Sequence, residues 1–146
     1  MKTCLVDTGP FVAYLNRSDP LHEGVATFID SFKGELVTTG AVVGEVMYFV
    51  SELASGAVSF AKFLLGSGVR IVDSTRPQQV LAAAELMGKY SDTPMDFADA
   101  TLVLLAGEIG VTEILTLDRR GFSTYRTAKG KGFRLILTAS KAKSSS

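Results

Sequence analysis

Five acidic residues stand where the chain could bring them together around a divalent metal ion. They are Asp7, Glu45, Asp96, Asp99 and Asp118. Each one follows or interrupts an apolar run, and a carboxylate in apolar surroundings costs free energy unless something compensates it. Mg²⁺ and Mn²⁺ prefer oxygen ligands and are the usual compensation. The five acids therefore predict a site for a hard cation.

Three of the acids also have an ordinary structural interpretation. Asp7 could cap the helix that Pro10 begins, because aspartate accepts N–H bonds at helix starts. Asp118 could be a turn residue before a glycine. Asp96 fits the third position of a helix that Thr93 caps. A carboxylate can do both jobs, so these interpretations leave the metal site open.

The other two acids are harder to explain without a site. Asp99 lies in line with the apolar face of its own helical pattern, where a structural aspartate would need an arginine partner. Glu45 flanks an apolar stripe, from which its side chain could also extend to water. The hydroxyl groups of Thr8 and Thr116 could hold carboxylates or a metal-bound water in position. His22 is the only histidine, so a histidine-based metal site is not expected.

Short apolar runs alternate with helical patterns along the chain. Strands are predicted over residues 2–6, 36–38, 69–72, 114–116 and 133–137. Helices are predicted over about 10–16, 22–32, 41–54, 57–66, 77–89 and 96–109. This alternation indicates an α/β fold with a parallel sheet covered on both faces. Sites in such sheets form outside the carboxyl ends of the strands, so chain order allows the five acids to converge.

Composition indicates one domain. Of the 146 residues, 47% are hydrophobic, which is enough for a core. We expect this domain to span residues 1–140 and residues 141–146 to form a basic, Ser-rich, disordered tail. Cys4 is the only cysteine, which excludes an intrachain disulfide and fits a reducing, cytoplasmic environment. No apolar run approaches the ~20 residues that a membrane helix needs.

The charges are distributed unevenly. All 15 acids lie within residues 1–118, whereas the last 28 residues carry 8 of the 15 Lys and Arg residues. A basic segment after an acidic cluster suggests a polyanion held beside a metal site. Arg119, Arg120 and Arg126 are the predicted contacts to such a polyanion, a nucleic acid. The alternative is a solvated basic tail that only aids solubility.

The chain resembles the PIN-domain ribonucleases of the VapC-like toxin group over about residues 2–138. The resemblance rests on the segments Leu5–Pro10, Gly44–Val46, Pro94–Ala100 and Thr116–Tyr125. It implies a three-layer sandwich with a parallel five-stranded sheet flanked by helices. Four acids match the family's acidic positions, namely Asp7, Glu45, Asp99 and Asp118. Asp96 matches an additional acid of this subgroup.

The resemblance also implies a function. The chain would be a metal-dependent endoribonuclease that binds one or two Mg²⁺ or Mn²⁺ ions, acts on RNA in the cytoplasm, and leaves 3′-hydroxyl and 5′-phosphate ends. The implied partner is a small VapB-like antitoxin, and the implied assembly is a homodimer. The apolar segment from Val46 to Leu64 is the candidate dimer face, with Met47, Tyr48, Phe60 and Phe63 as possible contacts. The alternative for these four residues is a place in the core.

Two other classes of function remain open from the residues alone. One is a receiver-type phosphoacceptor domain, in which Asp73, after the strand over 69–72, would be the phosphoacceptor. The other is a scaffold that binds metal or RNA without catalysis. Fold similarity does not separate the three classes.

Overall fold

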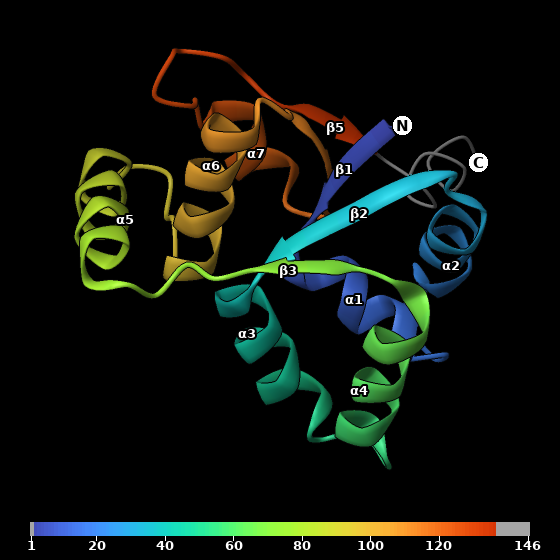
Figure 1. The fold of residues 1–146 in the computed structure, drawn as a ribbon. Coiled ribbons are helices and arrows are strands. Elements are labelled where there is room, and N and C mark those ends of the chain that lie inside the picture. Colours follow the sequence, from blue (N-terminus) through green and yellow to red (C-terminus); the bar gives the residue numbers. More distant parts are fainter. Residues whose placement is uncertain (1, 137–146) are drawn as a thin grey trace.

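A five-stranded parallel sheet forms the centre of the computed structural model, which describes residues 2–136 (Figure 1). The strands are β1 (Lys2–Val6), β2 (Gly34–Thr39), β3 (Arg70–Val72), β4 (Glu113–Leu115) and β5 (Arg134–Ile136). Their order across the sheet is β3-β2-β1-β4-β5. The α/β fold predicted from the sequence is therefore confirmed, and all five predicted strands are present.

Seven helices connect the strands within the described residues. They are α1 (Thr8–Leu15), α2 (His22–Ser31), α3 (Gly40–Val50), α4 (Gly56–Ser67), α5 (Pro77–Lys89), α6 (Phe97–Ile109) and α7 (Arg119–Thr124). The chain first moves outward from β1 to β3, and it then crosses back to β4 and β5. Because crossovers between parallel strands are right-handed, this reversal places α1 to α4 on one face and α5 to α7 on the other (Figure 1). The result is the expected three-layer sandwich.

The reversal of strand order occurs between β1 and β4, which are neighbours in the sheet. In open α/β sheets the ligand site lies outside the carboxyl ends of the strands at such a point. Asp7 and Thr116 are the first residues beyond these two strands, and the Asp7 amide donates to the Leu115 carbonyl at 3.0 Å.

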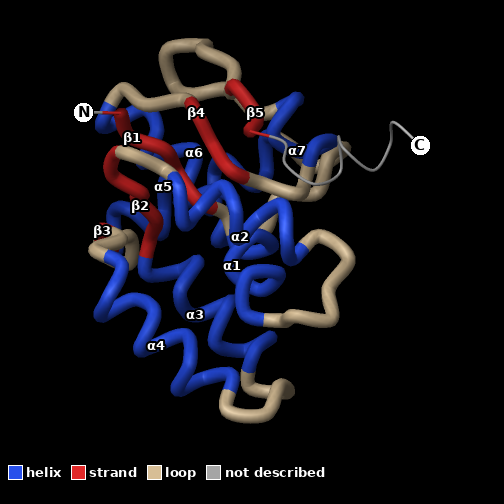
Figure 2. Tube along the Cα trace, turned by 90° about the vertical axis from the view of Figure 1, so that its right-hand side faces the viewer, coloured by secondary structure: helices blue, strands red, loops and turns tan. Residues whose placement is uncertain are grey.

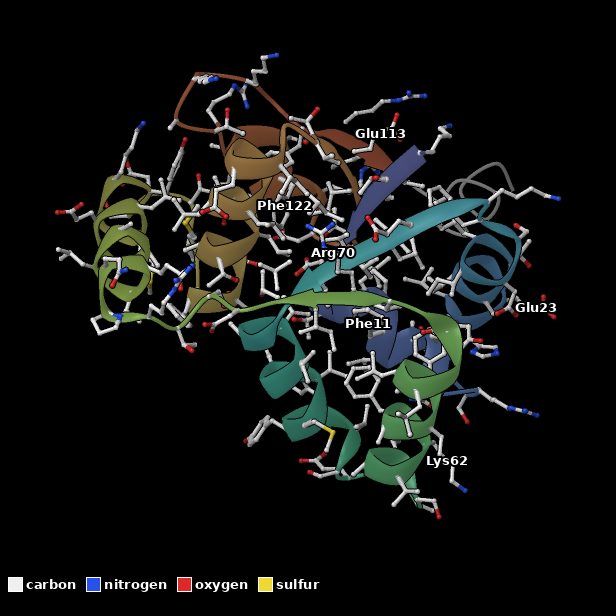
Figure 3. All side chains as sticks on the ribbon, in the orientation of Figure 1. Phe11, Glu23, Lys62, Arg70, Glu113 and Phe122 are labelled. Atoms are coloured by element: carbon white, nitrogen blue, oxygen red, sulfur yellow. The ribbon has the colours of Figure 1, made fainter. Side chains whose placement is uncertain are left out.

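The core has one aromatic cluster on each side of the sheet. Phe11 packs against Phe60 with ring centroids 5.5 Å apart, and Phe122 packs against Tyr125 at 5.2 Å. Figure 3 shows Phe11 and Phe122 on opposite sides of the central strands. Between them, Cys4 in β1 is fully buried, and burial raises the pKa of its thiol to about 12, so this cysteine is an inert core residue.

The structure corrects three expectations. Helix α7 was not predicted, and the helix predicted over 41–54 ends at Val50. Two of the proposed dimer contacts belong to the core. Phe60 is fully buried, and the half-buried Phe63 packs against Tyr14 with ring centroids 4.7 Å apart. Met47 and Tyr48 of the same segment are exposed.

Figure 2 shows α3 and α4 as a pair of helices that extends away from the strands. None of the helices within residues 2–136 has both the length and the apolar character to cross a membrane. The predicted tail, residues 141–146, lies outside the described residues.

Candidate active site

Asp7 occupies the centre of the site, between the ends of β1 and β4. Its side chain is only 6% exposed and caps α1, with Oδ1 accepting from the Thr8 amide at 2.8 Å. Oδ2 accepts from the Thr116 hydroxyl at 2.7 Å. Burial raises the pKa of Asp7 to about 6, although both hydrogen bonds oppose the rise. Asp7 is thus both a helix cap and a buried acid with an abnormal pKa.

Thr116 connects two of the acids. Its hydroxyl donates to Asp7 and accepts from the Asp118 amide at 2.9 Å. Asp118 is the N-cap of α7 and accepts from the Gly121 amide at 3.0 Å, so it is a helix cap rather than a simple turn residue. One hydroxyl group therefore fixes the positions of Asp7 and Asp118 relative to each other.

Glu45 reaches Asp7 from α3. Thr39, the last residue of β2, caps this helix with its hydroxyl, and Glu45 follows after about one turn. The Thr8 hydroxyl donates to Glu45 Oε1 at 2.5 Å. Burial raises the pKa of Glu45, and the negative charges of Asp96 and Asp7 raise it further. The Thr8 hydroxyl therefore holds the Glu45 carboxylate by a hydrogen bond, as the Thr116 hydroxyl holds the Asp7 carboxylate.

Asp96 and Asp99 cap the start of α6 reciprocally. The Asp99 amide donates to Asp96 Oδ1 at 2.8 Å, and the Asp96 amide donates to Asp99 Oδ2 at 3.1 Å. The predicted cap at Thr93 is wrong by three residues, because Asp96 itself is the N-cap. Burial, followed by the charges of Asp7 and Asp96, raises the pKa of Asp99 to about 8.

These five acids, which we call the acidic rim, share one electrostatic environment. The charges of Asp96 and Asp118 raise the pKa of Asp7, and the charge of Asp7 raises that of Asp99. In residues 2–136 the ion pairs join Arg70 to Glu35 and Arg134 to Glu113, so none reaches the rim. The arginine partner that a structural Asp99 would need is absent from this part of the chain.

The donor set of the rim suits a hard divalent cation. Every candidate ligand is a carboxylate or hydroxyl oxygen, which is what Mg²⁺ and Mn²⁺ prefer. Over the described residues, however, no three His, Cys, Asp or Glu side chains already form a metal cage. The reciprocal bonds of Asp96 and Asp99 use oxygens that a cation would otherwise take. The residue types and their charge fit a cation, although their side chains are engaged in capping.

The three arginines predicted to contact RNA have different environments. Arg119 and Arg120 are exposed and follow Asp118 directly, as the first two residues of α7. Arg126 Nη1 instead donates to the carbonyl groups of Ser123, Thr124 and Tyr125, the last at 2.9 Å. Arg126 thus closes the carboxyl end of α7, a role that the sequence did not suggest.

Tyr125 was missed as a site residue. It is fully buried, and its hydroxyl donates to the Pro94 carbonyl at 2.6 Å, two residues before Asp96. Gly121 gives this hydroxyl room, since a Cβ there would lie 2.9 Å from it. Burial raises the pKa of Tyr125, and the charge of Asp99 adds to the effect. Tyr125 therefore ties α7 to the segment that carries Asp96 and Asp99.

Thr116→Val should reduce stability more than Thr38→Val. Both hydroxyls are fully buried, but that of Thr38 makes one bond, to the Val6 carbonyl at 2.8 Å, whereas that of Thr116 contacts two rim residues. Without Thr116 the buried Asp7 carboxylate loses a donor, which should cost about 1–3 kcal/mol. Urea unfolding of both variants at neutral pH measures the difference, and equal losses would contradict this account.

Asp73 does not share the rim. It follows the edge strand β3 and accepts from the Thr75 amide at 3.1 Å, the leading reason that its pKa is lowered. Receiver domains have strand order 2-1-3-4-5, whereas this sheet has order 3-2-1-4-5. The receiver alternative therefore lacks structural support.

The model for the PIN domain family matches residues 4–129. Ribonuclease VapC26 of Mycobacterium tuberculosis is 33% identical over 133 residues, which cover 90% of this chain and 98% of that protein. All four segments that carry the sequence resemblance lie within the residues that the family model matches.

Two solved structures share the fold. One is the Mycobacterium tuberculosis toxin VapC20, described as cleaving the sarcin-ricin loop, with a TM-score of 0.69, 23% identity, and coverage of 77% of this chain and 87% of that chain. The other is VapBC2 of Rickettsia felis, bound to a DNA fragment from its promoter, with a TM-score of 0.60, 15% identity, and coverage of 92% and 98%. At these identities the likeness concerns the fold.

Proposed function

Because the chain belongs to the PIN domain family, we propose that it is a metal-dependent endoribonuclease whose active site is the acidic rim. The observation that supports this most is Thr116, which joins the buried Asp7 to Asp118 at the point where the strand order reverses. The name of the 33% identical relative supports RNA as the substrate class.

Asp7, Glu45, Asp99 and Asp118 would hold one or two Mg²⁺ or Mn²⁺ ions, with Asp96 as a further ligand. A bound divalent cation would supply an activated water and neutralise charge on the phosphate oxygens. The chain's own part is to hold the carboxylates, through Thr8 and Thr116, and it offers neither an exposed cysteine nor a free histidine as a nucleophile. Within residues 2–136 Cys4 is buried, and the His22 ring is engaged with the Ala13 carbonyl.

We further propose that the chain is the toxin of a toxin–antitoxin pair and acts in the cytoplasm. The VapC relative and the VapBC fold match support a VapB-like antitoxin as its partner. The exposed Met47 and Tyr48 on α3 support a homodimer with an apolar contact. The apparent mass from light scattering should exceed the 15.5 kDa of one chain. A monomer at all concentrations would contradict the proposed homodimer.

The test of activity is incubation with labelled RNA and Mn²⁺, with EDTA as the control. Fragments with new 5′-phosphate ends are expected only when the metal is present, and sequencing those ends identifies the RNA. A parallel incubation with acetyl phosphate tests the receiver alternative. Metal binding without any cleavage of cellular RNA would instead support the non-catalytic scaffold.

Replacing Arg119 and Arg120 by glutamine should weaken RNA binding and flatten its dependence on salt. Each lost contact with a phosphate of single-stranded RNA makes the slope of log K against log salt concentration less negative by roughly 0.7. Lys62→Gln is the matched control, because Lys62 is exposed on α4, away from α7 (Figure 3). Filter binding across a salt series gives both slopes. A larger effect from the control would mean that the RNA surface is misplaced.

A further inference from the structure

Tyr125 makes a hydrogen bond between two segments that each carry rim acids. Its hydroxyl donates to the Pro94 carbonyl at 2.6 Å. Tyr125 is the C-cap of α7, whose N-cap is Asp118, and Pro94 stands two residues before Asp96, the N-cap of α6. Within residues 2–136 no other hydrogen bond joins α7 and its caps to the segment around Asp96. This bond therefore helps to set the spacing between Asp118 and Asp96.

The Tyr125 hydroxyl also lies close to the acids themselves. A Cβ atom at Gly121 would lie 2.9 Å from this hydroxyl and would overlap Oδ2 of Asp118, so both groups reach the same small space. Burial raises the pKa of Tyr125, and the negative charges of four rim acids raise it further, those of Asp99, Asp118, Asp96 and Asp7. The hydroxyl therefore stays protonated at neutral pH and keeps its role as a donor.

The ring of Tyr125 is held independently of its hydroxyl. It is fully buried and packs edge to face against Tyr90 and Phe122, with ring centroids 5.1 and 5.2 Å apart. On the other side of the bond, Met95 follows Pro94 directly and is buried in the core. Without the hydroxyl, both segments would keep this packing and would lose only the directional contact between them.

We propose that Tyr125 is a positioning residue that makes the acidic rim selective for Mg²⁺ over Ca²⁺, an inference that rests on the rim being the metal site of the proposed nuclease. Mg²⁺ requires nearly octahedral geometry with ligands at about 2.0–2.1 Å, whereas Ca²⁺ accepts looser arrangements at about 2.3–2.6 Å. A bond that fixes the spacing between Asp118 and Asp96 favours the cation with the stricter requirement. Loss of the bond makes the rim more adaptable, which disfavours Mg²⁺ more than Ca²⁺.

Tyr125→Phe tests this, because phenylalanine keeps the ring contacts and removes the bond. Binding of Mn²⁺ to the full chain is followed by EPR without RNA, and Mg²⁺ and Ca²⁺ are titrated in as competitors. The Mg²⁺ dissociation constant should rise about tenfold, as expected on loss of a group that positions metal ligands. The Ca²⁺ dissociation constant should change by less than about threefold, since Ca²⁺ tolerates flexible sites.

Two control variants separate positioning from a general loss of stability. Tyr14→Phe removes a tyrosine hydroxyl that donates to Asp30 at 2.7 Å, outside the rim. Phe60→Leu weakens the aromatic cluster on the other side of the sheet and should lower the melting temperature. Both variants should keep the wild-type ratio of the Mg²⁺ and Ca²⁺ dissociation constants.

Gly121→Ala approaches the same contact from α7 and decides the question if Tyr125→Phe does not fold. The added methyl group would crowd the Tyr125 hydroxyl and Asp118, so the ratio should shift in the same direction. An unchanged ratio in folded Tyr125→Phe, or an equal shift in Phe60→Leu, would overturn the positioning role and leave the proposed nuclease standing. A wild-type protein that binds none of the three cations would overturn the metal dependence of the nuclease, and this inference with it.

Discussion

Asp99→Asn is expected to abolish RNA cleavage while the metal-free protein stays at least as stable as wild type. Burial and the charges of Asp7 and Asp96 raise the pKa of Asp99 to about 8, so its ionised form is disfavoured in the folded protein. Asparagine removes that charge and keeps the shape and an oxygen that can accept from the Asp96 amide. The lost electrostatic contribution should slow cleavage by about 10²–10³-fold or more.

The matched control for this change is Asp30→Asn. Asp30 is an exposed aspartate of α2 that accepts from the Tyr14 hydroxyl at 2.7 Å, outside the acidic rim. The Asp30→Asn variant should cleave RNA at the wild-type rate. Rates with labelled RNA and melting curves without metal are measured for both variants. Full activity in Asp99→Asn would contradict the assignment of the active site to the acidic rim. A marked loss of stability would show that Asp99 has a structural role.

Metal-free stability should fall as the pH rises, and Mn²⁺ should reverse the fall. The pKa values of Asp7 and Asp99 rise from 3.8 to about 6 and about 8 on folding. The folded protein therefore holds more protons than the unfolded chain between pH 4 and 8, so the free energy of unfolding decreases through this window. Mn²⁺ at a hundredfold excess over its dissociation constant should add about 2.7 kcal/mol, or roughly 5–10 °C in Tm.

Melting curves at pH 5, 6, 7 and 8, with EDTA or with Mn²⁺, measure this effect. Since a cation competes with protons for the carboxylates, the gain from Mn²⁺ should be greatest at pH 8. Asp99→Asn should show a shallower decline with pH and a smaller gain from the metal. A wild-type protein whose stability rises from pH 5 to 8 without metal would contradict the electrostatic account of the rim.

The sequence predicted the strands better than the contacts. β1 and β4 were identified as short apolar runs, and Asp7 and Asp118 were expected at one edge of the sheet. Which atoms meet there depends on β1 and β4 being neighbours, a long-range pairing that local patterns do not encode. The double hydrogen bond of Thr116 follows from that pairing.

Local competition explains the remaining errors. Thr93 and Asp96 are both good helix caps, and the helix begins after Asp96 because Asp99, three residues later, completes the reciprocal bonds. α7 is only 6 residues long and starts with Arg-Arg-Gly, too short for a periodic apolar pattern. Tyr125 was unrecognised because its partner, the Pro94 carbonyl, lies 31 residues earlier.

The tie between Tyr125 and Pro94 has a consequence for synthesis of the protein on the ribosome. Thr116, the partner of Asp7, is made 109 residues after it, and the fifth acid Asp118 and the anchor Tyr125 follow later still. A nascent chain that lacks them cannot assemble the rim, whatever part of it has already folded. A chain of this design can therefore complete the rim only after Tyr125 has left the ribosome, however early β1 and its neighbours fold.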